Sequence, residues 1–303
     1  MTVLRTQNLT KRYGGKPAID NVSITVEKGD IFGLIGQNGA GKTTFMRMVT
    51  SLTAPDSGKM ELFGESTPAK LTAARTRMGA MIEMPALYRH LTAEQNLEYC
   101  RLQRGIVERS RVQDVLKIVN LTDTGKKKFN NFSLGMKQRL GLALSMLSHP
   151  DFLILDEPTN GLDPTGIIEM RDLIKRLSKE GITILISSHL LSELAQMANK
   201  YAIIHHGRLI KSLTEGQLQE ECKQALAVTV DDVTKTAAIL ETALGIKDYK
   251  QVSSNEIRIY GYLKDPAEVT FKLSAEGIRV ASIKEVGDSL EDYYTKIIGG
   301  ASK

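Results

Sequence analysis

A glycine-rich segment near the N-terminus has the residue types needed to bind a phosphate chain. A glycine at 36, the pair Gly41-Lys42 and the hydroxyl of Thr43 have the spacing of a phosphate-binding loop. Glycines let backbone N–H groups turn toward an anion, and a helix beginning there adds its positive N-terminal end. We predict that Lys42 contacts the β- and γ-phosphates of a nucleotide and that Thr43 is a Mg²⁺ ligand. The predicted nucleotide-binding residues of this segment are Gly36, Asn38, Gly39, Ala40, Gly41, Lys42, Thr43 and Thr44.

Two adjacent carboxylates, Asp156 and Glu157, follow the apolar run 152–155. In phosphoryl transfer, an acid in this position holds Mg²⁺, usually through water. A second acid can orient or deprotonate the attacking water. Because adjacent residues of a strand point to opposite faces, the two acids are expected to have different roles. We assign Asp156 to the metal and Glu157 to the water.

The elements that position these residues are predicted from apolar runs and helical spacing. Runs without polar alternation are typical of strands buried on both faces, and alternation of strand and helix favours a parallel α/β core. The expected core elements are strands at 31–35, 152–155 and 182–187 and helices at 43–52 and 165–180. Elsewhere in this part we expect antiparallel strands at 2–8 and 20–27, an amphipathic helix at 102–120 and a hairpin at 201–213.

Residues 223–303 are predicted to form a second unit. Their pattern follows the order β-α-β-β-α-β with one further helix, which suggests a small α+β ferredoxin-like domain. The expected strands are 225–230, 249–252, 256–262 and 279–286, and the expected helices are 233–244, 266–276 and 290–298.

Composition limits the class of protein. The 303 residues are 42% hydrophobic and 25% charged, which is ordinary for a globular chain large enough to bury a core. The net charge of +5 does not choose among an anionic ligand, a membrane surface and nucleic acid. Cys100 and Cys222 are expected to be free thiols. The first residues lack the pattern of a signal peptide, and the apolar runs are too short to span a bilayer. Any membrane part is therefore expected from another chain.

The segment from Phe132 to Leu140 narrows the class of nucleotide-binding protein. It resembles the signature of ATP-binding cassette (ABC) ATPases, usually Leu-Ser-Gly-Gly-Gln, although Leu134 replaces the first glycine and Met136 replaces the glutamine. The resemblance implies that the nucleotide is ATP. It also implies that Ser133 and Gly135 meet the γ-phosphate of an ATP molecule bound to the opposite subunit of a homodimer.

Other segments resemble further motifs of the same family. Tyr13 matches the aromatic residue that stacks on adenine, Asp163 ends a segment similar to the D-loop, and His189 matches the switch histidine. Glu83 occupies the Q-loop position, where most members have glutamine and where the side chain reaches the metal. The resemblance implies catalytic roles for Lys42, Glu157 and His189, metal contacts for Thr43, Glu83 and Asp156, and nucleotide contacts for Tyr13, Glu83, Ser133, Gly135 and Asp163.

Glu83, segment 132–140 and segment 288–294 are similar to those of the bacitracin- and lantibiotic-resistance exporters. This similarity implies an α/β ATPase domain at 1–220, with a parallel α/β core, an antiparallel β subdomain and a helical subdomain at about 85–145. The small domain would occupy 223–303. The implied function is ATP hydrolysis by a homodimer that drives a separate transmembrane permease, located at the cytoplasmic face of the membrane, and that exports a peptide antibiotic.

Three alternatives remain open from the sequence. The first is an ABC-2 type exporter ATPase for another cargo. The second is a soluble ABC ATPase acting on ribosomes or DNA, but the chain has one phosphate loop and lacks the long insertion of the repair enzymes. Its short basic run, 126–128, is typical of a solvated loop, and we expect no nucleic-acid partner. The third is a small-molecule kinase, which would need an acceptor site and no signature helix.

Overall fold

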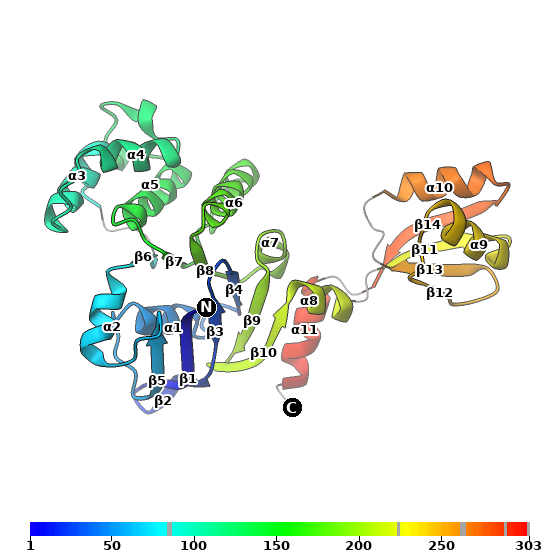
Figure 1. Cartoon of the computed structure of the whole chain (residues 1–303), viewed down its shortest axis with the longest axis horizontal. Helices are drawn as coiled ribbons and strands as arrows, with labels where there is room; N and C mark the ends of the chain where they lie inside the picture. Colours follow the sequence, from blue (N-terminus) through cyan, green and yellow to red (C-terminus); the bar gives the residue numbers. More distant parts are fainter. Residues whose placement is uncertain (84–86, 223–224, 261–264, 288–289, 302–303) are drawn as a thin grey trace. The chain divides into compact units, whose positions relative to one another are not determined.

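The computed structural model describes residues 1–303 except 84–86, 223–224, 261–264, 288–289 and 302–303 (Figure 1). Backbone contacts divide the chain into two compact units, Met1–Glu215 and Gly216–Lys303. The division falls at the start of helix α8 (Glu215–Cys222). The ranges expected from the sequence, 1–220 and 223–303, place it at the end of the same helix.

A six-stranded sheet forms the centre of the first unit. Its strand order is β10-β9-β4-β8-β7-β6, and every neighbouring pair is parallel except β9 and β10. All residues of β4 and β7 are buried, as their uninterrupted apolar sequences predict. The structure therefore confirms the parallel α/β core. The strands are β4 (Ile31–Ile35), β6 (Met78–Met81), β7 (Phe152–Leu155), β8 (Thr183–Ser188), β9 (Lys200–His205) and β10 (Arg208–Thr214).

A second, antiparallel sheet contains the N-terminal strands. Strand β1 pairs with β2, β3 and β5, which are β1 (Thr2–Tyr13), β2 (Lys16–Val22), β3 (Thr25–Glu27) and β5 (Ser57–Leu62). The single strand predicted at 20–27 is wrong, because it divides between β2 and β3. Between β2 and β3, the buried Thr6 hydroxyl replaces the hydrogen bonds of a strand. It donates to the Val22 carbonyl at 3.2 Å and accepts from the Ile24 N–H at 2.9 Å.

Helices α3, α4 and α5 form the helical part of this unit (Figure 1). The helices of the unit are α1 (Lys42–Val49), α2 (Pro68–Arg75), α3 (Ala93–Gln103), α4 (Ser110–Ile118), α5 (Leu134–Met146), α6 (Pro164–Lys179) and α7 (Leu191–Ala195), with short 3-10 turns η1 (Thr122–Thr124) and η2 (Phe129–Asn131). The continuous helix predicted at 102–120 is wrong. Gly105 has φ +68° just after α3, and Arg101 donates to the Ile106 carbonyl of the turn that follows.

The second unit has a four-stranded antiparallel sheet of order β12-β13-β11-β14. Its elements follow the predicted order: β11 (Ala225–Val230), α9 (Val233–Ala243), β12 (Tyr249–Gln251), β13 (Glu256–Tyr260), α10 (Pro266–Ala275), β14 (Val280–Val286) and α11 (Leu290–Ala301). Numbered within the unit, the order is 2-3-1-4, which is the arrangement of a ferredoxin-like domain. Leu226, Val228 and Ile257 pack with Leu240 and Leu273 in its core.

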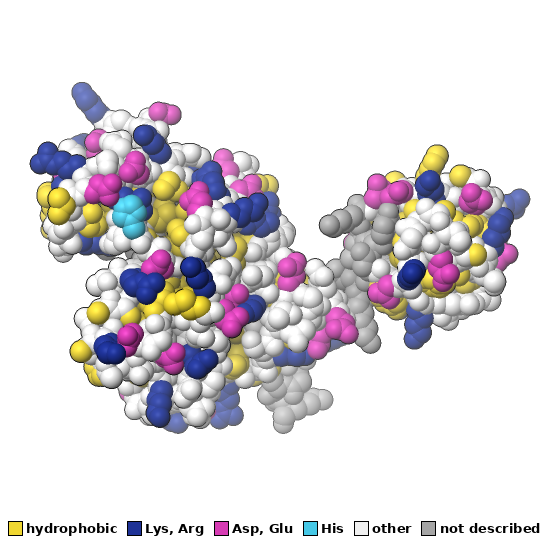
Figure 2. Space-filling view, in the orientation of Figure 1, with side chains coloured by type: hydrophobic (Ala, Val, Ile, Leu, Met, Phe, Trp, Pro, Cys, Tyr) yellow, Lys and Arg dark blue, Asp and Glu magenta, His cyan; other side chains and the backbone are white. Residues whose placement is uncertain are grey.

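No helix among the described residues is long and apolar enough to cross a membrane. On the face shown in Figure 2, basic and acidic side chains are interspersed over the first unit and do not gather in one patch of a single sign. Cys100 and Cys222 are not joined in a disulfide, as expected.

Candidate functional site

The predicted phosphate loop lies between β4 and α1, as its mechanism requires. Gly36 has no space for a side chain, since an added Cβ would lie 2.6 Å from the Ile204 carbonyl oxygen. Gly41 has φ +110°, and a Cβ there would lie 2.5 Å from the Ala18 carbonyl oxygen. Glycine is therefore required at both positions for steric reasons. Asn38 and Gly39 are exposed at the tip of the loop, while Ala40 is buried and Thr44 is half-buried on α1.

The turn between β9 and β10 supports this loop from behind. The Gly207 N–H donates to the Ala40 carbonyl at 2.9 Å, and the Gly207 carbonyl accepts from the Asp20 N–H at 2.8 Å. The hairpin was predicted, but this contact was missed. Only the pair His206-Gly207, a typical turn sequence, gave a local signal of it.

Lys42 is the first residue of α1 and its side chain is almost completely buried. Its Nζ donates to the carbonyls of Gly36, at 2.5 Å, and Gln37, at 3.3 Å. It also lies 3.1 Å from Oε1 of Glu157. A buried ammonium needs such partners, because desolvation without them is costly. Lys42 is thus held inside the loop, where a bound phosphate would lie.

Thr43 and Asp156 meet where α1 begins and β7 ends. The Thr43 hydroxyl donates to Asp156 Oδ2 at 2.7 Å, and the Ser187 hydroxyl donates to Oδ1 at 2.6 Å. A hydroxyl and a carboxylate are the oxygen ligands that Mg²⁺ prefers, with water and phosphate completing its shell. These residues fit a magnesium site beside the loop.

Glu157 and His189 form a second polar pair. His189 Nδ1 lies 2.8 Å from Glu157 Oε2, and the Glu157 N–H donates to the Ser187 hydroxyl at 2.9 Å. We expected strand alternation to separate Glu157 from Asp156, and that reason is wrong, because β7 ends at Leu155. The acids have different partners because Glu157 adopts the left-handed conformation, with φ +48°.

Ser187 was missed as a functional residue, although it contacts both acids. It lies at the buried end of β8, two residues before His189. Two serines at the end of an apolar run, just before a candidate histidine, were the available signal.

Among the described residues, the Glu83 side chain contacts Arg47 and not the predicted metal ligands Thr43 and Asp156. Its carboxylate is 2.6 Å from Nη2 of Arg47 on α1, and both side chains are exposed. Tyr13 is also half-exposed, at the end of β1, with the Lys11 Nζ 5.5 Å from its ring centroid. An aromatic face beside a cation is open to a planar ring here.

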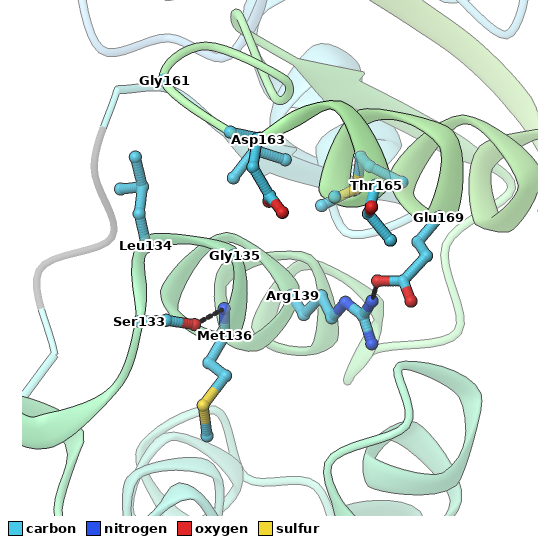
Figure 3. A pocket seen from close by; sticks show the side chains of 12 residues that line it. Ser133, Leu134, Gly135, Met136, Arg139, Gly161, Asp163, Thr165 and Glu169 are labelled. Atoms are coloured by element: carbon cyan, nitrogen blue, oxygen red, sulfur yellow. Dashed lines mark hydrogen bonds and ion pairs between the residues drawn. The ribbon is translucent and has the colours of Figure 1, made fainter.

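The signature residues line a separate pocket of about 510 Å³ (Figure 3). None of the described residues lining it belongs to the phosphate loop. Ser133 caps α5 by accepting from the Met136 N–H at 3.3 Å, which places its hydroxyl at the positive end of the helix. Asp163 borders the pocket where α6 begins. The lining is Ser133, Leu134, Gly135, Met136, Arg139, Gly161, Leu162, Asp163, Thr165, Gly166, Glu169 and Met170.

Contacts between α5 and α6 line one side of the pocket. Arg139 of α5 forms an ion pair with Glu169 of α6 (Figure 3). Leu134, which stands where the signature usually has glycine, points to Gly161, whose added Cβ would lie 2.8 Å from its Cδ2. The signature and the D-loop of one chain are therefore packed together.

Comparison with known proteins identifies the family. The sequence model of the ABC transporter family matches residues 19–160. The chain is 42% identical to the bacitracin transport ATP-binding protein BcrA of Bacillus licheniformis, over 99% of both chains. It is also 42% identical to the lantibiotic transport ATP-binding protein SrtF of Streptococcus pyogenes, over 69% of this chain and 89% of that one.

Solved structures agree with this assignment. The structure of a dimeric bacterial ABC transporter cassette matches with a TM-score of 0.64 and 25% identity, over 70% of this chain and 99% of that one. The matched fold, the phosphate loop and the signature pocket are thus found together with full-length sequence similarity. The chain belongs to the ABC transporter family and is one of its ATP-binding, ATP-hydrolysing subunits.

Proposed function

We propose that two copies of the chain close around two Mg·ATP molecules, and that each ATP site is completed by the signature pocket of the other copy. The observation that carries this proposal is the separation of the two half-sites within one chain. Lys42, Thr43 and Asp156 lie at the phosphate loop, whereas Ser133 and Gly135 line a pocket that shares no described residue with it. A shared site across a two-fold axis makes ATP part of the interface.

Each polar residue near the phosphate loop then has its own role in ATP hydrolysis. Thr43 and Asp156 would hold Mg²⁺, which would neutralise negative charge on the phosphates. Glu157 orients and deprotonates the attacking water, and His189, 2.8 Å from its carboxylate, holds Glu157 in place. Lys42 binds the phosphate oxygens, and Tyr13 stacks on adenine. Across the interface, Ser133, Gly135 and the positive end of α5 bind the γ-phosphate, while Asp163 contacts the other copy.

We further propose that the loop leading into helices α3–α5 transmits the closing and opening of the two copies to a membrane permease. We assign this coupling to the loop 83–91, of which residues 84–86 lie outside the described part of the chain. Its end is fixed to α3 by the buried Asn96: the Tyr88 N–H donates to Asn96 Oδ1 at 2.8 Å, and Asn96 Nδ2 donates to the Tyr88 carbonyl at 3.1 Å. The rings of Tyr88 and Tyr99 pack edge-on and remain half-exposed, which leaves an aromatic contact surface for a partner.

The proposed cargo is a peptide antibiotic, because the relatives named above act on bacitracin or a lantibiotic. The chain would then lie at the cytoplasmic face of the membrane, held there by its permease. Disruption of the gene that encodes this chain should sensitise the cell to bacitracin or a lantibiotic. Unchanged sensitivity to both would refute the cargo while leaving the ATPase assignment intact.

The composite site is tested by mixing two inactive variants. Lys42→Ala removes the phosphate contact of a chain's own site, and Ser133→Arg blocks the pocket that serves the other copy. In a mixed dimer, one site combines the intact halves of both chains. Random pairing makes half of the dimers mixed, each with one working site of two, so we expect roughly a quarter of the parent ATPase rate.

Ser133→Ala is the control variant, because it separates the loss of the helix cap from the steric block of the pocket. Ser133→Ala also removes the bond to the Met136 N–H, at a cost of about 1 kcal/mol, without filling the pocket. Only Ser133→Arg should abolish turnover through steric block. If the mixture is as inactive as either variant alone, or if Ser133→Arg turns over at the parent rate, the composite site is wrong.

A further inference from the structure

An ion pair connects α1 to the segment that carries Glu83. Nη2 of Arg47 lies 2.6 Å from Oε1 of Glu83, and about half of each side chain is exposed. By its resemblance to the family, Glu83 stands in the position of a glutamine, and the proposed function gives no role to Arg47. The structure shows that the additional negative charge has a specific partner.

Arg47 occupies a position from which it can control the distance between Glu83 and the metal site. It lies four residues after Thr43 on the same helix, so both side chains lie on one face, separated by about 6 Å along the axis. The Glu83 carboxylate is thus bound by a side chain of the same helix that carries the hydroxyl contacting Asp156. Glu83 itself has φ +61°, a conformation that side-chain contacts must help to maintain.

We propose that Arg47 is a positioning residue that holds the Glu83 carboxylate on α1 and thereby weakens its attraction for Mg²⁺ at Thr43 and Asp156. A carboxylate free to approach a divalent cation raises its affinity, because the number of charged ligands tunes metal binding. The guanidinium competes for that carboxylate. The inference rests on the proposed metal-binding role of Thr43 and Asp156.

The size of the effect follows from the exposure of the pair. Exposed ion pairs contribute at most about 1 kcal/mol, so releasing Glu83 should change the Mg²⁺ dependence by about two- to fivefold. A glutamine at position 83 would not need such a partner, because it carries no charge. The effect of Arg47 should therefore depend on the acid at position 83.

The test is equilibrium binding of a fluorescent, non-hydrolysable ATP analogue to the full chain during a Mg²⁺ titration. We expect Arg47→Gln to lower the Mg²⁺ concentration at the midpoint by two- to fivefold, and Arg47→Lys to have a smaller effect. In the Glu83→Gln background, Arg47→Gln should cause no further shift. Arg77→Gln is the matched control, since Arg77 forms a similarly exposed pair with Asp151, 2.7 Å away, at the start of β7.

The outcomes separate this inference from the proposed function. A midpoint that rises or stays constant in Arg47→Gln, an equal shift in the Glu83→Gln background, or an equal shift in Arg77→Gln would overturn the role of Arg47. If the parent chain bound the analogue without any Mg²⁺ dependence, the metal site would be refuted, and this inference with it.

Discussion

Replacing Ser187 by alanine should damage both stability and hydrolysis, because one buried hydroxyl connects the two acids. Ser187 is fully buried, donates to Asp156 Oδ1 at 2.6 Å and accepts from the Glu157 N–H at 2.9 Å. A hydrogen bond to a charged group contributes about 1.5–3 kcal/mol, and a buried N–H left without a partner costs about 1–3 kcal/mol. Allowing for local relaxation, we expect the free energy of unfolding to fall by about 2–4 kcal/mol.

The effect on turnover should exceed what a stability loss alone would cause. Removing a residue that hydrogen-bonds to a metal ligand and orients it typically lowers activity by about 10–100-fold. The ATPase rate of Ser187→Ala should fall by this factor at a temperature where the protein remains folded. Urea unfolding followed by circular dichroism gives the stability, and phosphate release gives the rate.

Ser145→Ala is the control for this prediction. Ser145 is equally buried and donates at 2.7 Å to the Leu142 carbonyl, but both lie within α5. Its removal should cost less than about 1 kcal/mol and leave the ATPase rate unchanged. A Ser187→Ala protein with parent stability, or with parent turnover, would refute the reasoning.

Three further changes test two residues of the site and one histidine at the end of β9. Gly41→Ala should abolish nucleotide binding, since its φ is +110° and its Cβ would lie 2.5 Å from the Ala18 carbonyl oxygen; measurable binding would refute the steric argument. Glu157→Gln should lower the ATPase rate by about 10²–10⁴-fold while ATP binding persists and dimers accumulate in gel filtration, and a parent rate would remove Glu157 from its role. The pKa of His205 is lowered mainly by burial and, to a smaller extent, by the neighbouring His206. The folded state therefore resists its protonation. Stability should then fall as pH drops below about 6.5, and His205→Gln should flatten that dependence in urea unfolding, whereas an unchanged slope would contradict it.

Elements with a strong local pattern could be predicted from the sequence. The buried strands β4 and β7 are uninterrupted apolar runs, and their chain order with the helices defines a parallel core. The phosphate loop was also predictable, because its glycines, Lys42 and Thr43 lie in one short continuous segment. In these cases the residues that determine the structure lie close together in sequence.

Long-range contacts explain what the sequence did not reveal. The break between β2 and β3 depends on the hydroxyl of Thr6, which lies 16 residues away from its partner Val22. The pairing of Ser187 with Asp156 spans 31 residues, and that of Arg47 with Glu83 spans 36. The helix predicted at 102–120 failed for a local reason, because its amphipathic spacing continues across Gly105, which ends α3.

Lys42 of the phosphate loop and Glu157 form an ion pair, so a phosphate that binds Lys42 must also affect Glu157. Lys42 lies 3.1 Å from Glu157 and also donates to two loop carbonyls. When Lys42 binds phosphate oxygens, its three donors must leave some of these partners, and Glu157 loses a cation that competes for its carboxylate. Oε1 of Glu157 is then available to the attacking water, while His189 Nδ1 stays 2.8 Å from Oε2. We therefore expect the chain to keep Glu157 paired and unreactive until the phosphate site is filled. Substrate binding itself would then make the base available.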